Sequence, residues 1–174
     1  NGATSLYNGV AIGDGAISTD AQSIAIGGQS QSTGNISVAI GANSEAKDIQ
    51  AVALGFSAIA NNAYTTAVGA DAQALGQNST ALGTLAEAHG INDVAVGAMA
   101  KASGGFATAM GDSANASGYE SLALGAGTEA RANISAAIGT RAIANGDSSV
   151  ALGSDVEATD TNSVAIGTSS TATG

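Results

Sequence analysis

The chain has 174 residues and a formal net charge of −10, with 25 glycines and no proline, cysteine or tryptophan. This length suits one domain. Because 44% of the residues are hydrophobic but only 3% are aromatic, any core must be thin and built from small side chains. Only four residues are basic, namely Lys47, Lys101, Arg131 and Arg141. Nucleic acids and anionic membranes are therefore excluded as partners, since both need a basic patch.

Disulfide-linked proteins, thiolate metal-binding proteins and membrane-spanning helices are excluded by what the sequence lacks. Without cysteine there is no disulfide framework and no thiolate metal site. No apolar run approaches the length of a membrane span, and no signal peptide opens the sequence. We expect a single repeat domain over residues 1–174.

The dominant feature is an internal repeat, an Ala-x-Gly triplet that recurs every 14 residues without insertion or deletion. We number each copy from its glycine, which is position zero. The twelve position-zero residues are Gly13, Gly27, Gly41, Gly55, Gly69, Gly83, Gly97, Gly111, Gly125, Gly139, Gly153 and Gly167.

Other positions of the repeat are almost as regular. Position minus two is always alanine, from Ala11 to Ala165, and position minus one is always apolar. Position minus three is usually β-branched, and position plus five is Ala or Ser. Position plus seven is Gly, Asp or Asn in eleven of the twelve copies, with Ala132 as the exception. Gly, Asp and Asn tolerate a left-handed backbone, so this position predicts a tight corner.

The two corner positions, zero and plus seven, divide each copy into two strands of about five residues. The pattern predicts an all-β, single-stranded β-solenoid of about twelve coils. Because the sequence starts and stops within the repeat, we expect it to be a fragment of a longer chain.

Other architectures with a related period do not fit. A coiled coil with two heptads per repeat would carry a glycine in nearly every heptad, and each glycine would destabilise the helix by about 1 kcal/mol. The sequence also lacks strong apolar residues at two positions of the heptad, which a coiled coil needs. Nine-residue calcium repeats and hexapeptide coils have different periods.

Strand alternation predicts which side chains are internal. In the third coil, Val38 and Ile40 share one face of the first strand, and Ala39 lies on the other. Ser44 and Ala46 share a face of the second strand, opposite the charged positions. We predict that Val38 and Ile40 pack inside against Ser44 and Ala46. The alanine column would then form a flat outer face on which identical chains associate.

These residues carry a family resemblance. Residues 162–170 read Asn-Ser-Val-Ala-Ile-Gly-Thr-Ser-Ser, an Asn-Ser-Val-Ala-Ile-Gly-x-x-Ser motif, and residues 36–44 match this motif apart from its first position. This motif resembles the head repeat of YadA-like trimeric autotransporter adhesins, over essentially the whole chain. The resemblance implies a homotrimer of left-handed parallel β-rolls with 14-residue coils, exposed on the bacterial cell surface. Membrane attachment would come only through a C-terminal anchor, which is missing from this sequence together with the neck and stalk.

No catalytic, cofactor or metal site is predicted. His89 is the only histidine, which excludes catalytic triads and most transition-metal sites. Asp155, Glu157 and Asp160 could hold a hard cation such as calcium, although a solvated acidic rim is the simpler interpretation. Glycine-rich stretches lack the Lys-Ser/Thr of a phosphate loop. Four tripeptides fit glycosylation acceptors and are attributed to chance in an Asn- and Ser-rich repeat; they begin at Asn35, Asn78, Asn115 and Asn133.

Three functions are open to a solenoid with a repeating surface. The resemblance implies an adhesin head that binds host extracellular-matrix proteins (collagen, fibronectin, laminin) or cell-surface receptors, and the alternative is a structural spacer of a surface fibre. An ice-binding face needs a regular threonine array, and Thr66, Thr80 and Thr108 only interrupt an aliphatic column. No ligand-binding residue is assigned. The few aromatics (Tyr7, Phe56, Tyr64, Phe106, Tyr119) are predicted near corners, packed at the end of the roll or at a trimer seam.

Overall fold

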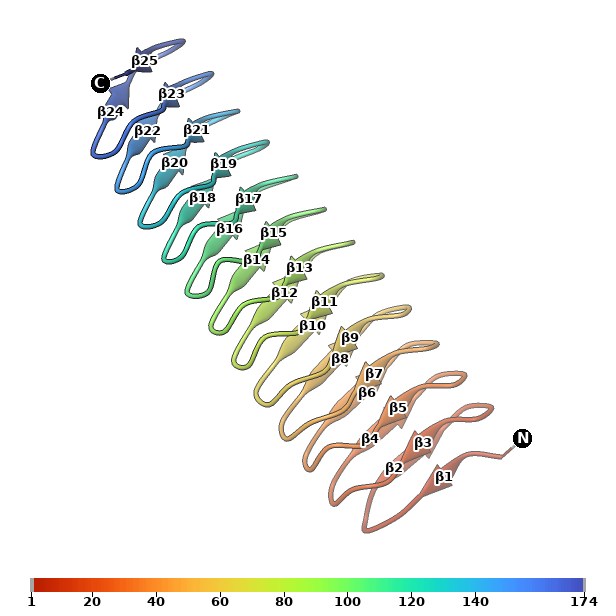
Figure 1. The fold of residues 1–174 in the computed structure, drawn as a ribbon. Coiled ribbons are helices and arrows are strands. Elements are labelled where there is room, and N and C mark those ends of the chain that lie inside the picture. The colour runs from red at the N-terminus through yellow and green to blue at the C-terminus, as the bar shows by residue number, and fades with distance from the viewer. Residues whose placement is uncertain (1, 174) are drawn as a thin grey trace.

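The computed structural model describes residues 2–173 and shows one unbroken stack of coils (Figure 1). Each coil contributes one strand to each of two parallel sheets, one of 13 strands and one of 12. No helix in the described residues is long and apolar enough to cross a membrane.

The strands of the two sheets alternate along the chain. The 13-stranded sheet consists of two-residue strands: β1 (Thr4–Ser5), β3 (Ile17–Ser18), β5 (Gln31–Ser32), β7 (Glu45–Ala46), β9 (Ile59–Ala60), β11 (Gln73–Ala74), β13 (Glu87–Ala88), β15 (Lys101–Ala102), β17 (Asn115–Ala116), β19 (Glu129–Ala130), β21 (Ile143–Ala144), β23 (Glu157–Ala158) and β25 (Thr171–Ala172). The 12-stranded sheet consists of three-residue strands: β2 (Val10–Ile12), β4 (Ile24–Ile26), β6 (Val38–Ile40), β8 (Val52–Leu54), β10 (Thr66–Val68), β12 (Thr80–Leu82), β14 (Val94–Val96), β16 (Thr108–Met110), β18 (Leu122–Leu124), β20 (Ala136–Ile138), β22 (Val150–Leu152) and β24 (Val164–Ile166).

Pairing between coils follows the sequence repeat. Every strand pairs in parallel with the strand two places along the chain, so that Ala39 of β6 lies beside Ala53 of β8 and each partner is 14 residues away. Equivalent positions therefore form straight columns along the stack. The predicted parallel solenoid and its period are confirmed, but its strands have two or three residues rather than about five, because the turns occupy more of each coil.

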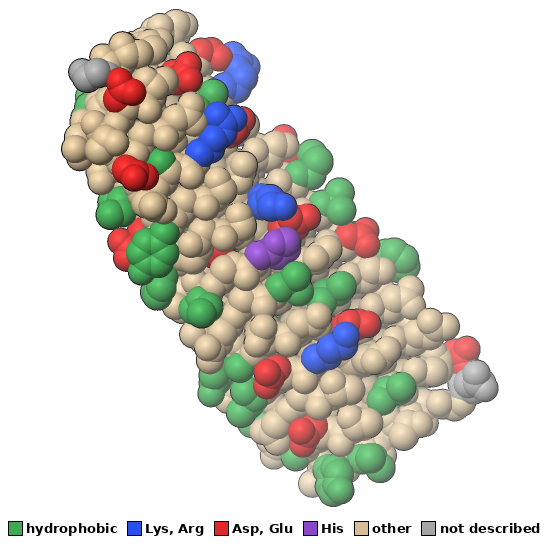
Figure 2. All heavy atoms as spheres, in the orientation of Figure 1, with side chains coloured by type: hydrophobic (Ala, Val, Ile, Leu, Met, Phe, Trp, Pro, Cys, Tyr) green, Lys and Arg blue, Asp and Glu red, His purple; other side chains and the backbone are tan. Residues whose placement is uncertain are grey.

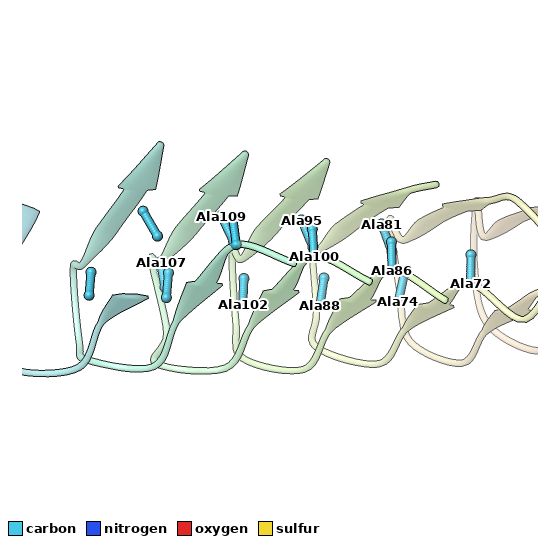
Figure 3. Close-up of a cluster of buried hydrophobic side chains, with 14 of the residues drawn as sticks. Ala72, Ala74, Ala81, Ala86, Ala88, Ala95, Ala100, Ala102, Ala107 and Ala109 are labelled. Atoms are coloured by element: carbon cyan, nitrogen blue, oxygen red, sulfur yellow. The ribbon is translucent and has the colours of Figure 1, made fainter. Parts of the chain in front are cut away.

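The prediction of which first-strand residues are internal was wrong. Ala39 is fully buried within the chain, whereas Ile40 is 39% exposed and Val38 is half-buried. Ser37, which we also expected on the outer side with Ala39, is buried too, and its column is internal. The other internal columns hold Ser44- and Ala46-type residues, as predicted, and the methyl groups of the alanines in these columns fill the gap between the sheets (Figure 3). The gap is so narrow that Val or Ile at position minus two would overpack it.

Several small polar groups in this core donate hydrogen bonds to the turns. Ser37 donates its hydroxyl hydrogen to the carbonyl oxygen of Gly34 at 2.6 Å, and Ser44 does the same to Gly41 at 2.8 Å. One coil carries an ionisable group instead. Asp93 is fully buried, and its carboxylate accepts hydrogen bonds from the backbone nitrogens of Gly90 at 2.7 Å and Ala107 at 2.8 Å.

Each coil has two turns, which we call the first turn (positions zero to plus two) and the second turn (positions plus seven to plus nine). At position zero, φ lies between 114° and 139°, which only glycine adopts readily. The left-handed residues of the two turns stand at positions plus two and plus nine, as in Asn43 (φ 59°) and Ile36 (φ 56°). In two second turns the residue at position plus eight, Tyr7 or Gly105, also has a positive φ.

Position plus seven does not need the left-handed backbone that we predicted there. No described residue at this position has a positive φ. Glycine at this position instead lets successive coils approach closely, since a Cβ on Gly118 would lie 1.8 Å from the carbonyl oxygen of Ala132. Ala132 is therefore not a conformational exception, because its own φ is one that alanine adopts freely.

Candidate functional site

Residues 2–173 contain no pocket, and the side chains open to a partner lie on the outer surface of the stack. The surface has four sides. Two are the outer faces of the sheets, and two are the edges formed by the first and second turns. Each side repeats from coil to coil, so side chains of one position stand in a row along the stack.

The outer face of the 12-stranded sheet is aliphatic. It is formed by positions minus three and minus one, which are the residues that we predicted to be internal. Several of its members are well exposed within one chain, including Ile12 (57%), Leu124 (40%) and Leu152 (41%). Only Thr66, Thr80 and Thr108 place a polar side chain in these two columns. We call this surface the aliphatic face.

The outer face of the 13-stranded sheet is polar and charged, and Figure 2 shows its acidic and basic side chains lying next to one another. We call it the charged face. Here Lys47 pairs with Glu45 at 2.5 Å, Lys101 with Glu87 of the preceding coil at 2.8 Å, and Arg131 with Glu129. All three pairs are substantially exposed, so each contributes at most about 1 kcal/mol to stability.

The remaining basic residue lies on the first-turn edge. Arg141 donates two hydrogen bonds to Asp155 of the next coil, from Nε at 2.6 Å and from Nη2 at 2.8 Å. Hydrogen bonding from the Arg141 guanidinium, followed by that from Ser154, lowers the pKa of Asp155, and the same carboxylate raises the pKa of Arg141. All four basic residues of the chain therefore have a carboxylate partner.

The candidate metal residues do not form a site. Asp155 lies in a first turn and pairs with Arg141 of the preceding coil, Glu157 lies on the charged face, and Asp160 lies in the following second turn. The structure brings together no group of three or more His, Asp or Glu side chains able to hold a metal ion within residues 2–173. His89 stands on the charged face, with its Nε2 atom 3.8 Å from Glu87 Oε2.

The four glycosylation-type asparagines occupy different environments. Asn78 and Asn133 are exposed in second turns, whereas Asn35 and Asn115 are half-buried. Asn133 Oδ1 accepts a hydrogen bond from the backbone nitrogen of Tyr119 at 3.1 Å. Asn133 therefore links two coils.

The aromatic residues lie at the turns, as predicted, and all are about half exposed or more. Tyr7, Tyr64, Phe106 and Tyr119 belong to second turns, and Phe56 belongs to a first turn. Sequence reasoning treated these residues singly. The signal that it missed is that the second turn also carries Ile36, Ile91 and Ile134, each about half exposed.

Known proteins with a similar sequence repeat exist. The sequence model of the YadA head domain repeat (2 copies) matches residues 7–30, 32–58, 60–86, 88–114, 103–128, 135–155 and 158–174. Among curated proteins, no relative matches at a significant level. One similar solved structure is the collagen-binding domain of the Yersinia adhesin YadA, with 27% identity and a TM-score of 0.43, over 77% of this chain and 67% of that one.

The fold and its surfaces define a parallel β-solenoid whose coils are identical in length and whose outer faces repeat along the stack. Since the family matches cover most of the sequence, the chain belongs to the YadA head-repeat family and is a YadA-like head domain.

Proposed function

We propose that this chain is the head of a bacterial surface adhesin, which acts by binding and not by catalysis. Its partners are host extracellular-matrix proteins, with collagen, fibronectin and laminin as candidates, or cell-surface receptors. The observation that carries the proposal is the unbroken stack of family repeats with a repeating outer surface and no pocket in residues 2–173. A rod of this kind binds a fibrous ligand by many similar weak contacts.

We further propose that the head is a homotrimer of left-handed β-rolls, displayed at the cell surface on an outer-membrane anchor. The aliphatic face supports association, since a row of exposed aliphatic side chains along the whole stack is far more apolar than a monomer surface needs to be. The association surface is therefore the aliphatic face, in place of the buried alanine column. Three copies with this face towards a common axis would remove it from water and leave the charged faces outside.

The assembly is tested by light scattering. We expect about three times the 16.4 kDa chain mass. Val94→Glu together with Val96→Glu places two carboxylates on the aliphatic face and should abolish the trimer, whereas Gln73→Glu on the charged face should leave it intact. A wild-type monomer that is stable at micromolar concentration would contradict the trimer.

Binding is tested on immobilised collagen, fibronectin and laminin and on cultured host cells. We expect saturable binding that falls more than proportionally when coils are removed, because avidity depends on the number of simultaneous contacts. With coils about 4.8 Å apart, twelve coils span about 58 Å, which is long enough to engage several segments of a fibrous ligand. Folded trimer that binds none of these surfaces would favour a spacer role in a surface fibre.

A further inference from the structure

One group of exposed apolar side chains is not explained by the aliphatic face. Ile91, Phe106, Tyr119 and Ile134 come from the second turns of four consecutive coils, and we call them the apolar ridge. They are 54%, 52%, 48% and 58% exposed, respectively. The rings of Phe106 and Tyr119 contact each other edge to face, with centroids 5.8 Å apart. Since coils are about 4.8 Å apart, the ridge is about 14 Å long.

The ridge places apolar side chains where they do not help folding. Phe106 and Ile134 stand at position plus nine with φ of 54° and 55°, a left-handed backbone that bulky and β-branched residues rarely adopt. The same position holds asparagine in other coils, at Asn78, Asn92 and Asn162, and asparagine suits this backbone better. Backbone preference therefore does not account for Phe106 and Ile134 at this position.

Hydrogen bonds between coils hold the ridge rigid. The backbone nitrogen of Phe106 donates to the Ile91 carbonyl oxygen at 2.8 Å, and that of Ile134 donates to the Tyr119 carbonyl oxygen at 2.7 Å. The Tyr119 ring also lies over Gly105, since a Cβ on Gly105 would be 3.6 Å from Tyr119 Cδ2. A surface ordered before binding loses little conformational entropy when a partner docks.

The second-turn edge that carries the ridge is acidic. Every charged residue in the second turns is acidic, namely Asp20, Asp48, Glu120, Asp147 and Asp160. The four basic residues lie elsewhere and are paired with carboxylates. Along the left margin of Figure 2, where the second turns lie, hydrophobic and acidic side chains stand together without a basic one. The charge of Glu120 also raises the pKa of the neighbouring Tyr119 hydroxyl.

We propose that the apolar ridge with Glu120 is a docking site for an extended, arginine-bearing polypeptide segment of the partner. An arginine guanidinium can stack on the faces of the Phe106 and Tyr119 rings and pair with the Glu120 carboxylate. Apolar neighbours in the same segment then cover Ile91 and Ile134. This inference rests on the proposed adhesin function and assigns it a location within the repeat.

The test compares two matched double variants. Phe106→Asn with Ile134→Asn removes half of the ridge and relieves two left-handed backbones. Leu85→Asn with Met99→Asn makes the same change at position plus two on the opposite edge, where φ is 58° and 55° and the exposed fractions are 49% and 53%. Both variants should melt no lower than wild type, because asparagine suits the left-handed backbone.

The probes are a fluorescein-labelled Arg-Pro repeat peptide and a Glu-Pro repeat peptide, followed by fluorescence anisotropy. We expect wild type to bind only the arginine peptide, the ridge variant to bind it about tenfold more weakly, and the opposite-edge variant to bind it within about twofold of wild type. Glu120→Gln should weaken binding and reduce its dependence on salt.

Several results would overturn the proposal. The first is wild-type protein that does not bind the arginine peptide. The second is a ridge variant that binds this peptide as tightly as wild type does. Loss of the oligomeric mass in the ridge variant would likewise contradict it and assign the ridge to a subunit seam. The adhesin function itself is tested in a separate assay, and it fails if wild-type protein binds neither immobilised matrix proteins nor host cells.

Discussion

At the scale of the residue, glycine at position zero combines two requirements. Its φ near 130° is accessible to glycine, and its Cα lies against the backbone of the next coil. A Cβ on Gly27 would be 2.6 Å from the carbonyl carbon and oxygen of Gly41. Gly28, the next residue, lacks both constraints, because its φ is not positive and a Cβ there would come no closer than 3.9 Å to another coil.

These neighbours give a sharp comparison. Gly27→Ala should destabilise the fold by about 2–4 kcal/mol, because it adds both backbone strain and a backbone clash. Gly28→Ala should stay within about 0.5 kcal/mol of wild type. Denaturant unfolding measures both values. Equal stabilities of the two variants would contradict the turn geometry.

A second residue-scale prediction concerns the buried Asp93. Its two carboxylate oxygens each accept one backbone hydrogen bond. Asp93→Asn replaces one acceptor with a donor that faces an N–H group, and should cost about 1–3 kcal/mol. The same change at the exposed Asp112 should be nearly neutral. Urea unfolding of the two variants distinguishes these outcomes, and a stable Asp93→Asn protein would show that the buried bonds are dispensable.

At the scale of the element, each strand presents opposite environments on its two sides. In β11, Ala74 is fully buried between the sheets, whereas its neighbour Gln73 faces outward on the charged face. The internal columns contain almost entirely Ala and Ser, so the space available to any one side chain is set by small neighbours in the coils on either side.

This thin core makes size the critical property of an internal residue. Ala74→Leu should cost at least about 1–3 kcal/mol, because the sheets must separate locally to accept it. Gln73→Leu adds a side chain of the same kind on the outside and should change stability by less than about 0.5 kcal/mol. The melting temperatures of the two variants, measured by thermal denaturation, give the comparison. If Gln73→Leu were the more damaging, the assignment of faces would be inverted.

At the scale of the whole molecule, the stack is one-dimensional. Each strand pairs only with strands of the adjacent coils. The free energy of unfolding is therefore approximately the sum of the stabilities of the single coils and of the interfaces between neighbouring coils. Removing a complete coil creates a new pair of neighbours that is equivalent to the old one, because every coil has the same length.

Deletion of Gly83 to Val96 removes 14 residues and should leave a folded, shorter rod. Deletion of 13 residues, from Gly83 to Ala95, shifts the downstream residues by one and points internal side chains outward. Circular dichroism and limited proteolysis should show the first variant to be ordered and the second to be disrupted. Equal tolerance of both deletions would contradict the solenoid.

The sequence by itself determined the solenoid, its period, its two turns and the family. Period-14 repetition of small and apolar residues leaves few ways to satisfy the backbone other than in-register pairing between coils. Position-zero glycine and the outward row of Glu45-type residues were likewise predicted correctly.

Tertiary structure decided which side of the first strand is inside. Alternation separates Val38 and Ile40 from Ala39 but does not say which set faces the core, and burial of the larger side chains was the natural expectation. Burial in the folded chain shows the answer, since Ala39 is enclosed with Ser44- and Ala46-type residues whereas Ile40 is 39% exposed. The backbone angles of the turns could not be predicted from the sequence either. Ile36 and Phe106 adopt a left-handed conformation only where hydrogen bonds between coils enforce it.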